Sequence, residues 1–373
     1  MLTLDKVYKA SHVLKEVIRE TDLIKAPKIN KEAEVYLKTE NLQVTGSFKV
    51  RGAYFKISQL SDEEKAKGVI ACSAGNHAQG VALAASRAGI KSLICLPDGA
   101  PISKVEATKS YGAEVCLVEG VYDDAYAKAL QLRDEKGYTF IHPFDDEDVI
   151  AGQGTIGLEV LEQLPDVDAV VVPIGGGGLI SGVAFTVKQL KPSVRVYGVQ
   201  AEGAPSMVNS LKDGKIECLE SVHTIADGIK VKEPGEHTFE YCSKYVDGVV
   251  TVSDDEISSA ILHLIEAYTE LYKADHNEEV AKRLKFQLGQ MRDIVYTPET
   301  NALKVFFDTK FDLVGDIHSF GHDIEATWLM DLACDTLGDE ELKKQFAEMD
   351  LKISHNIQNI ALDNGALNNE REN

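Results

Sequence analysis

Short apolar runs alternate with helical patterns from about residue 34 to residue 252, and this alternation restricts the fold more than any other feature of the chain. The runs, which we expect to be strands, span residues 34–38, 69–72, 93–96, 115–118, 169–174, 194–200 and 248–252. Helical patterns such as 78–88 and 102–111 separate them. Such alternation predicts parallel βαβ units and therefore an α/β fold. The strands form two groups, 34–145 and 168–252, so we expect two lobes with a cleft between them.

The pattern changes after Val252. Ser253 and Glu256 have the spacing of a capping box, which predicts the start of a helix. Apolar residues then recur at helical spacing (Ile257, Ile261, Leu264, Tyr268, Leu271; Val280, Leu284, Leu288, Met291, Val295; Ile324, Trp328, Leu332; Phe346, Met349, Ile353, Ile357, Ile360). The last third is therefore expected to consist of helical hairpins. Apolar positions within residues 3–19 predict a further helix, on the surface.

Charge and composition exclude several classes of partner. The net charge of -21 argues against nucleic acid or an anionic membrane surface as a partner. No apolar run approaches the roughly 18 residues of a membrane span, and the N-terminal residues do not have the pattern of a signal peptide. The six cysteines have no metal-ligand spacing, so we expect free thiols, no metal site and a cytoplasmic location.

The first chemical motif runs from Thr45 to Ala53 and contains Lys49. Lys49 lies between small residues and Phe48, just after a predicted strand. A partly desolvated lysine loses its proton more easily and can attack a carbonyl group. The alternative is an ordinary solvated surface lysine.

Two further motifs follow predicted strands. Small residues in Ser73-Ala74-Gly75-Asn76-His77 would let backbone N–H groups approach an anion such as a carboxylate, although a plain capped βα turn is the alternative. Gly175, Gly176, Gly177 and Gly178 precede Leu179. Consecutive glycines are entropically costly, so a loop that wraps a phosphate explains them better than a flexible turn.

A reactive lysine, a carboxylate loop and a phosphate loop together suggest pyridoxal 5'-phosphate as the cofactor. The segments 47–53, 73–77 and 175–178, with 151–155 and 226–228, closely resemble the fold-type II threonine/serine dehydratases. The resemblance covers residues 1–258 and implies a two-lobed, parallel-sheet α/β architecture with a small lobe at about 50–145.

The resemblance also implies a role for each motif. Lys49 would form the Schiff base and abstract the substrate α-proton. Phe48 would lie beside the cofactor ring, Asn76 would hydrogen-bond its 3'-oxygen, and residues 175–179 would hold the phosphate. The backbone of Ser73, Ala74, Gly75, Asn76 and His77 would bind the substrate carboxylate.

The implied reaction converts threonine to 2-oxobutyrate, or serine to pyruvate, with release of ammonia. Serine racemases resemble this set but have a serine at the position of Ala74, so elimination is favoured over racemisation. Dimers or tetramers are usual among the relatives, so a homo-oligomer is expected.

The resemblance ends near residue 258. The Glu-Gly-Ala-Gly-like turn and the Ser-Gly-Gly-Asn strand end of the dehydratases do not occur beyond that point. Instead, residues 261–373 resemble an internal fragment of cellobiose 2-epimerase, of the N-acylglucosamine 2-epimerase family. This implies that residues 259–373 are an α-rich piece of an (α/α)6 barrel, and that the chain is a chimera of a C-terminally truncated dehydratase and an epimerase fragment.

The resemblance implies that His322 and Glu325 match residues of the epimerase acid/base machinery and that His263 matches another active-site histidine. His322 and Glu325 are three residues apart on a predicted helix, so they share one face and suit proton transfer. The alternative is a structural role, as a surface salt bridge or a helix cap. Most of the barrel is missing, so we expect the three residues to be non-functional. Three functions remain open: a dehydratase with reduced activity, a sugar 2-epimerase and a non-catalytic fusion product.

Overall fold

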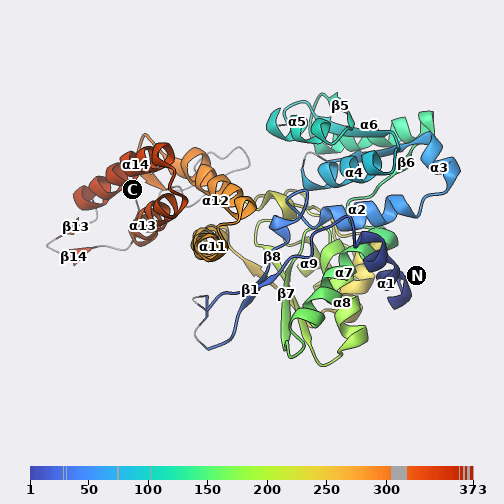
Figure 1. The fold of residues 1–373 in the computed structure, drawn as a ribbon, viewed down its shortest axis with the longest axis horizontal. Coiled ribbons are helices and arrows are strands. Elements are labelled where there is room, and N and C mark those ends of the chain that lie inside the picture. Colours follow the sequence, from blue (N-terminus) through green and yellow to red (C-terminus); the bar gives the residue numbers. More distant parts are fainter. Residues whose placement is uncertain are drawn as a thin grey trace.

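The computed structural model contains two separate parallel sheets followed by a group of helices (Figure 1). It describes residues 1–27, 29–30, 32–73, 75–100, 102–303, 317–360, 362–363, 366–367 and 370–372. The two sheets confirm the predicted α/β class, and all their neighbouring strands are parallel.

The first sheet has the strand order β5-β4-β3-β6. Its strands are β3 (Val69–Cys72), β4 (Ser92–Pro97), β5 (Glu114–Val118) and β6 (Thr139–Phe140). On one face Ala71 and Ile94 pack with helices α4 (Asn76–Arg87) and α5 (Ile102–Ser110). On the other face Ile70 and Cys95 pack with α6 (Tyr122–Lys136). Both faces are covered, as is usual for a parallel sheet.

The second sheet, β7-β8-β9, is covered differently. It is formed by β7 (Ala169–Pro173), β8 (Arg195–Ala201) and β9 (Gly248–Val252). Helices α7 (Glu147–Gln163), α8 (Gly178–Leu190) and α10 (Glu236–Tyr245) contribute to the core on one face. On the other face Val171 is 64% exposed and Val250 54% exposed. An apolar face of a parallel sheet is therefore exposed to solvent.

Helix α7 joins the two lobes because its glycines let neighbouring backbones approach closely. A Cβ atom at Gly152 would lie 2.6 Å from the Arg51 oxygen of helix α2 (Lys49–Ser58), and one at Gly182 of α8 would lie 2.3 Å from the Ile150 oxygen. Helices α2 and α8 are thus packed on either side of α7, and each begins at one of the predicted motifs.

Helix α1 (Leu4–Leu14) is a surface helix, as the sequence predicted, with one face buried and the other exposed. Val7, Ala10 and Leu14 are fully buried, and the helix packs mainly on α7 and α2. The helix is shorter than expected, and residues 15–18 form a turn. The remaining N-terminal elements are a hairpin of β1 (Leu23–Lys25) and β2 (Tyr36–Lys38), the 3-10 turn η1 (Glu40–Leu42) and α3 (Asp62–Lys67).

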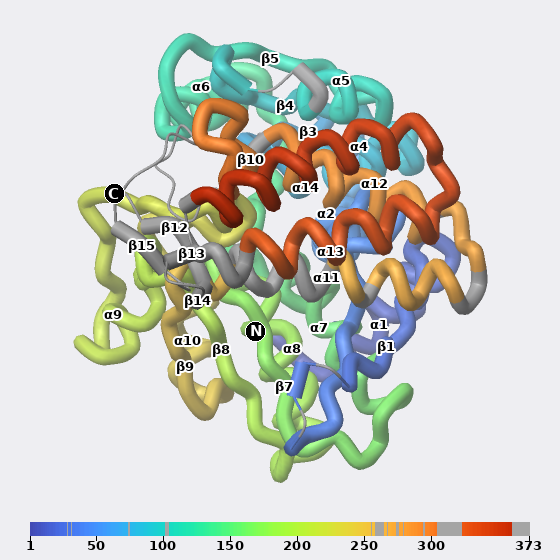
Figure 2. The backbone as a smooth tube through the Cα atoms, turned by 90° about the vertical axis from the view of Figure 1, so that its left-hand side faces the viewer, coloured from blue at the N-terminus to red at the C-terminus, as the bar shows by residue number. Residues whose placement is uncertain are grey.

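The C-terminal helices pack on one another, as Figure 2 shows. They are α11 (Asp254–Asp275), α12 (Glu278–Gln290), α13 (Phe320–Leu337) and α14 (Glu340–Ile360). The π-turn η3 (Met291–Val295) follows α12 directly. Strands of two or three residues (β10, Tyr296–Thr297; β11, Ala302–Leu303; β12, Ile317–Ser319; β13, Leu362–Asp363; β14, Ala366–Leu367; β15, Glu370–Glu372) form antiparallel pairs.

One predicted apolar face is wrong. Ile324 and Trp328 of α13 are 43% and 57% exposed, while Ala326, Leu329, Met330 and Ala333 are buried. The face formed by the buried residues packs against α11 and α14, so Ile324 and Trp328 lie outside this contact. The boundary proposed at residue 258 falls inside the continuous helix α11.

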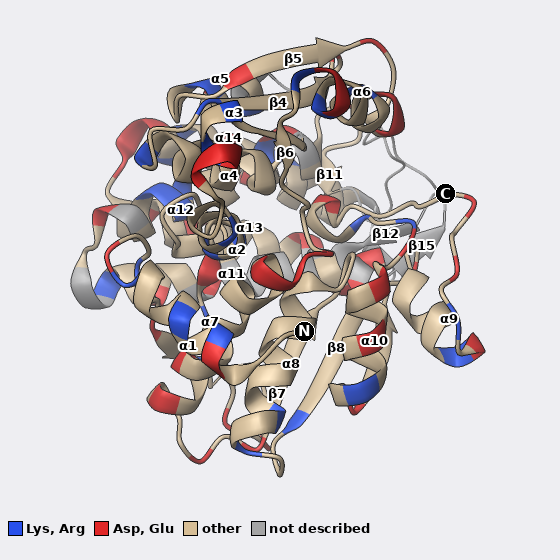
Figure 3. Cartoon of the chain, turned by 90° about the vertical axis from the view of Figure 1, so that its right-hand side faces the viewer, with Lys and Arg blue, Asp and Glu red and all other residues tan. Residues whose placement is uncertain are grey.

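The large-lobe loops contain α9 (Ser206–Asp213) and the short turn η2 (Asp227–Ile229). In the described part of the chain, no helix is long and apolar enough to cross a membrane. Basic and acidic residues are interspersed over the ribbon rather than gathered by sign (Figure 3).

Candidate active site

Lys49 is the first residue of helix α2, and the turn before it is tightly held. Gly46 has a φ of 74°, in the left-handed region, and its N–H donates to the Gln43 oxygen at 2.6 Å. The Ser47 hydroxyl oxygen accepts the Lys49 N–H at 3.1 Å. Glycine suits this turn because residues with a Cβ atom are strained at such a φ. The turn therefore sets where the Lys49 side chain emerges.

The Lys49 amine is crowded by protein atoms although its side chain keeps some exposure. Its Nζ donates to the Pro143 oxygen at 2.7 Å and lies 5.4 Å from the Phe48 ring centre. Burial disfavours the charged ammonium and lowers the pKa of Lys49 to about 8. A substantial fraction of the amine is thus neutral near physiological pH, as a nucleophile toward an aldehyde requires.

The second motif lies at the junction of β3 and α4. The Gly75 N–H donates to the Ser73 hydroxyl oxygen at 3.1 Å, and the exposed Asn76 begins α4. The first N–H groups of a helix have no acceptor within it, so this end can accept an anion. Ala74 lies outside the described residues. The predicted contacts of this motif with substrate and cofactor stay predictions.

His77 is buried beneath the same turn. Its Nε2 lies 2.9 Å from the Ile141 oxygen, and since a carbonyl only accepts, this nitrogen carries the hydrogen. Burial, with the nearby charge of Lys49, lowers the pKa of His77 to about 3, so the imidazole is neutral. Its Nδ1 is buried and has no hydrogen-bond partner among the residues that the structure describes.

The glycine loop is packed rather than flexible. Gly177 has a φ of 97° and caps α8, which begins at Gly178. A Cβ at Gly176 would lie 2.5 Å from the Phe144 ring, one at Gly178 2.8 Å from the Phe144 Cβ, and one at Gly177 2.8 Å from Thr238. The Thr238 hydroxyl donates to the Gly176 oxygen at 2.6 Å. Only glycines fit here, and the N–H groups at the start of α8 form a cradle suited to phosphate.

The segment 141–145 connects the three motifs, and sequence reasoning missed it. Ile141 accepts from His77, Pro143 accepts from Lys49, and Phe144 packs on the glycine loop. The Asp145 carboxylate accepts the N–H groups of Glu236 and Thr238, both at 3.1 Å. The aromatic residues at and just after the end of the short strand β6 (Phe140, His142, Phe144) were the available signal, but such residues more often form core.

An ion network supports Lys49 from the far side of α2. The buried Arg51 guanidinium donates to Glu40 at 2.7 and 2.8 Å and to Glu159 at 2.9 Å. Burial alone would lower the pKa of Arg51, but the two carboxylates more than offset it and raise that pKa. The network joins α2 to η1 and α7, which restricts movement of the lysine.

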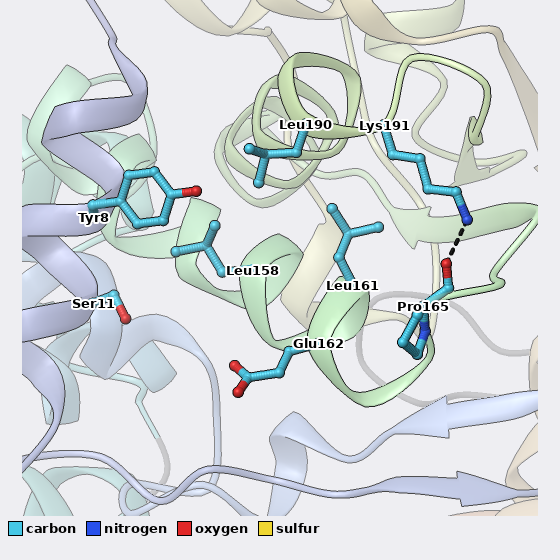
Figure 4. A pocket seen from close by; sticks show the side chains of 8 residues that line it. All are labelled: Tyr8, Ser11, Leu158, Leu161, Glu162, Pro165, Leu190 and Lys191. Atoms are coloured by element: carbon cyan, nitrogen blue, oxygen red, sulfur yellow. Dashed lines mark hydrogen bonds between the residues drawn. The ribbon is translucent and has the colours of Figure 1, made fainter.

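A separate surface cavity of about 470 Å³ lies between α1, α7 and α8 (Figure 4). Leu158, Leu161 and Leu190 line it together with Tyr8, Ser11, Glu162, Pro165 and Lys191. The Lys191 amine donates a hydrogen bond to the Pro165 oxygen at 2.5 Å. None of the predicted site residues lines this cavity, so it is not the candidate active site.

The epimerase-like residues are distributed over two helices. The side chains of His263 in α11 and His322 in α13 lie outside the described part, and Glu325 is exposed. Asp323, which lies between His322 and Glu325 in the sequence, is buried, and this burial raises its pKa to about 7. The predicted proton-transfer pair is therefore not tested by the structure.

The residues present fit a phosphate-bearing aldehyde cofactor. An amine with a lowered pKa and a glycine cradle at a helix N-terminus are joined through the two adjacent residues Pro143 and Phe144. In the described part of the chain, no cluster of side chains could hold a metal ion.

Comparisons with known proteins point to the same chemistry. A family profile described as "Pyridoxal-phosphate dependent enzyme" matches residues 14–269. An L-threonine ammonia-lyase of Thermotoga maritima is 53% identical over 268 residues, which cover 71% of this chain and 67% of that protein. The structure of processed threonine deaminase isoform 2 from Solanum lycopersicum is 41% identical, with a TM-score of 0.68, covering 75% of this chain and 82% of that one.

A different match involves a shorter stretch. The crystal structure of a sugar epimerase from a ruminal bacterium is 88% identical over 30% of this chain and 29% of that chain. The TM-score of that match is 0.29.

Proposed function

Because this chain belongs to the family of pyridoxal-phosphate-dependent enzymes, we propose that it is a carbon–nitrogen lyase that deaminates L-threonine or L-serine. The products are a 2-oxo acid and ammonia. The observation that carries the proposal is the hydrogen bond of Lys49 to Pro143, next to the residue that packs on the glycine loop. An activated amine and a loop suited to phosphate that contact two adjacent residues support this proposal.

Lys49 and residues 175–179 would hold the cofactor, Lys49 at its aldehyde carbon and the loop at its phosphate. When bound, the cofactor supplies an electron-withdrawing ring that stabilises negative charge at the substrate Cα. The neutral Lys49 amine then accepts the α-proton, since a base with a pKa near the operating pH is the most effective. The N–H groups of 73–77 would orient the substrate carboxylate.

His77 has a positioning role in this proposal. Its imidazole is neutral and donates to the backbone of Ile141, two residues before Pro143. A neutral ring adds no positive charge beside Lys49, which would otherwise lower the basicity of the amine further. His77 thus holds the segment that receives Lys49 without acting as an acid or base itself.

The test is product formation with added cofactor. L-Threonine should give 2-oxobutyrate and ammonia in equal amounts, and L-serine should give pyruvate. Absence of a 2-oxo acid with either amino acid at high protein concentration would contradict the proposal. Ala74 favours elimination over racemisation, so D-serine should not accumulate from L-serine.

We also infer that residues 259–373 form a second, non-catalytic part, related to the (α/α)6-barrel sugar epimerases. The family match ends at residue 269, and the Ser319–Glu325 segment has the epimerase pattern. Exposed Glu325 argues against a closed sugar site around it. We further propose a homo-oligomer in the cytoplasm, which size-exclusion chromatography with light scattering and cell fractionation would test.

A further inference from the structure

The turn that precedes Lys49 is held from one side by the N-terminal region. The Gln43 amide oxygen accepts the Arg19 N–H at 2.7 Å, and its amide nitrogen donates to the Arg19 oxygen at 2.6 Å. The Arg19 guanidinium donates to the Leu42 oxygen at 2.8 Å. Gln43, Thr45 and Ser47 are buried, so the turn is part of the packed structure.

The other side of this turn faces the C-terminal helices. A Cβ built at Gly46 would lie 2.5, 2.9 and 3.0 Å from Nη2, Nη1 and Cζ of Arg283, which is in α12. Three atoms of one planar group at similar distances mean that the guanidinium lies against the Gly46 backbone. A Cβ atom at this position would require the guanidinium to move.

Apolar packing continues from this contact. Leu42, in η1, belongs to the core cluster formed by Leu284 and Leu288 of α12 with residues of α11, α13 and α14. At the start of α11, the Asp254 carboxylate accepts the Thr224 hydroxyl at 2.6 Å and the Ile225 N–H at 3.1 Å. The C-terminal helices are thus attached to the α/β part at two places, one of them the turn before Lys49.

We propose that Arg283 is a positioning residue for Lys49: α12, although it lies beyond the matched family region, forms one wall of the turn that places the lysine. The proposal rests on the assignment of Lys49 as the reactive amine. The guanidinium keeps Gly46 in its left-handed conformation, and the Ser47 hydroxyl then fixes the start of α2. Helix α12 acts on the lysine through the turn and does not touch the reacting atoms.

Hydrogen exchange in the protein without cofactor tests the proposal independently of any activity. In Arg283→Ala, amides of residues 44–49 should exchange at least about tenfold faster than in the original chain, because local opening of the turn becomes easier. Arg283→Lys should recover part of the protection. Arg292→Ala is the matched control, since Arg292 bonds Asp293 and Gln345 away from the turn and should leave exchange at 44–49 unchanged.

Equal protection of 44–49 in Arg283→Ala and Arg292→Ala would overturn the proposal. If Arg283→Ala lowers global stability, a double-mutant cycle with Gly46→Ala still decides. A methyl group at Gly46 collides with the guanidinium only when Arg283 is present. Gly46→Ala should therefore raise the exchange rate at 44–49 less in the Arg283→Ala background than in the original chain, and the two rate increases should differ by at least about threefold. If Gly46→Ala raises the exchange rate equally in both backgrounds, the contact between Arg283 and Gly46 is contradicted.

Activity distinguishes this inference from the proposed function. If the original chain is a dehydratase, Arg283→Ala should lower kcat about tenfold with little change in KM, because the lysine and not the substrate site is displaced. A chain without dehydratase activity would refute the proposed function, while the exchange result would still decide the role of Arg283.

Discussion

The Nζ atom of Lys49 lies 2.7 Å from the carbonyl oxygen of Pro143, a residue 94 positions away in the chain. This contact brings the first residue of α2 to the segment that packs on the glycine loop. Lys49 and the glycine loop therefore contact two adjacent residues, Pro143 and Phe144, although the two motifs come from different lobes.

Replacement of the lysine should abolish catalysis without unfolding the protein. We expect Lys49→Ala to lower kcat by about 10²–10⁴-fold, because both the covalent attachment and the proton acceptor are lost. Lys65→Ala, on the exposed helix α3, is the matched control and should retain full activity. Both rates should be measured as 2-oxo acid release, and equal activity in the two variants would rule out Lys49 as the reactive amine.

The lowered pKa of Lys49 predicts a specific pH dependence of its reactivity. Below a pH of about 8 the amine is mostly protonated in the folded protein, so its reductive methylation should be slow and should rise through that pH. Because the folded pKa lies below the value of 10.5 for a free lysine, the unfolded chain binds more protons between these values, and stability should increase with pH across this window. Peptide mapping after short methylation pulses measures the first effect. A Lys49 profile that coincides with those of surface lysines would contradict it.

The glycine loop should not accept a methyl group at Gly176. Gly176→Ala places a Cβ 2.5 Å from the Phe144 ring, so we expect about 1–3 kcal/mol of destabilisation and weaker cofactor binding. Gly99→Ala is the control, since among the described residues no heavy atom lies within 4 Å of its Cβ position. Chemical denaturation and cofactor titration check both effects. If Gly176→Ala were as stable as Gly99→Ala, the close packing of Phe144 on this loop would be wrong.

Removal of Arg51 should be costly because it leaves two carboxylates without their shared cation. Arg51→Met is expected to lower the free energy of unfolding by about 3–5 kcal/mol, since Glu40 and Glu159 are only 12% and 14% exposed. Arg133→Met removes an exposed pair with Asp134 and should cost no more than about 0.5 kcal/mol. Urea denaturation of the two variants gives the comparison, and similar costs would show that the buried network is dispensable.

The epimerase-like residues should not contribute to any catalytic activity of the chain. His322→Ala and Glu325→Gln are expected to leave 2-oxo acid release unchanged, and the original chain should not convert cellobiose to its mannose-ended epimer. Detection of that epimer by chromatography, lost in His322→Ala, would instead support sugar epimerisation.

Local patterns predicted most of the α/β part because its strands and helices are short, regular and ordered along the chain. The strands at 69–72 and 248–252 have the predicted bounds, and Ser253 with Glu256 forms the predicted capping box. The residues on which α1 packs could not be predicted in this way, since Phe185 and Tyr241 lie far along the sequence.

The same limit applies to the site. Lys49 and the glycine loop were found from residue type and spacing, but Pro143 and Phe144 carry no chemical signature of their own. Their importance comes from backbone and ring positions that only the tertiary structure brings next to Lys49 and Gly176. The contact of Arg283 with Gly46 was likewise hidden, because nothing in a helical pattern reveals which loop a helix will face.

Reductive trapping identifies the lysine that binds the cofactor aldehyde. The purified chain is mixed with pyridoxal phosphate, reduced with borohydride, digested and mapped by mass spectrometry. We expect a single pyridoxyl phosphate group, on Lys49, with visible absorbance before reduction that is lost in Lys49→Ala. A label spread over surface lysines, with Lys49 unmodified, would contradict it.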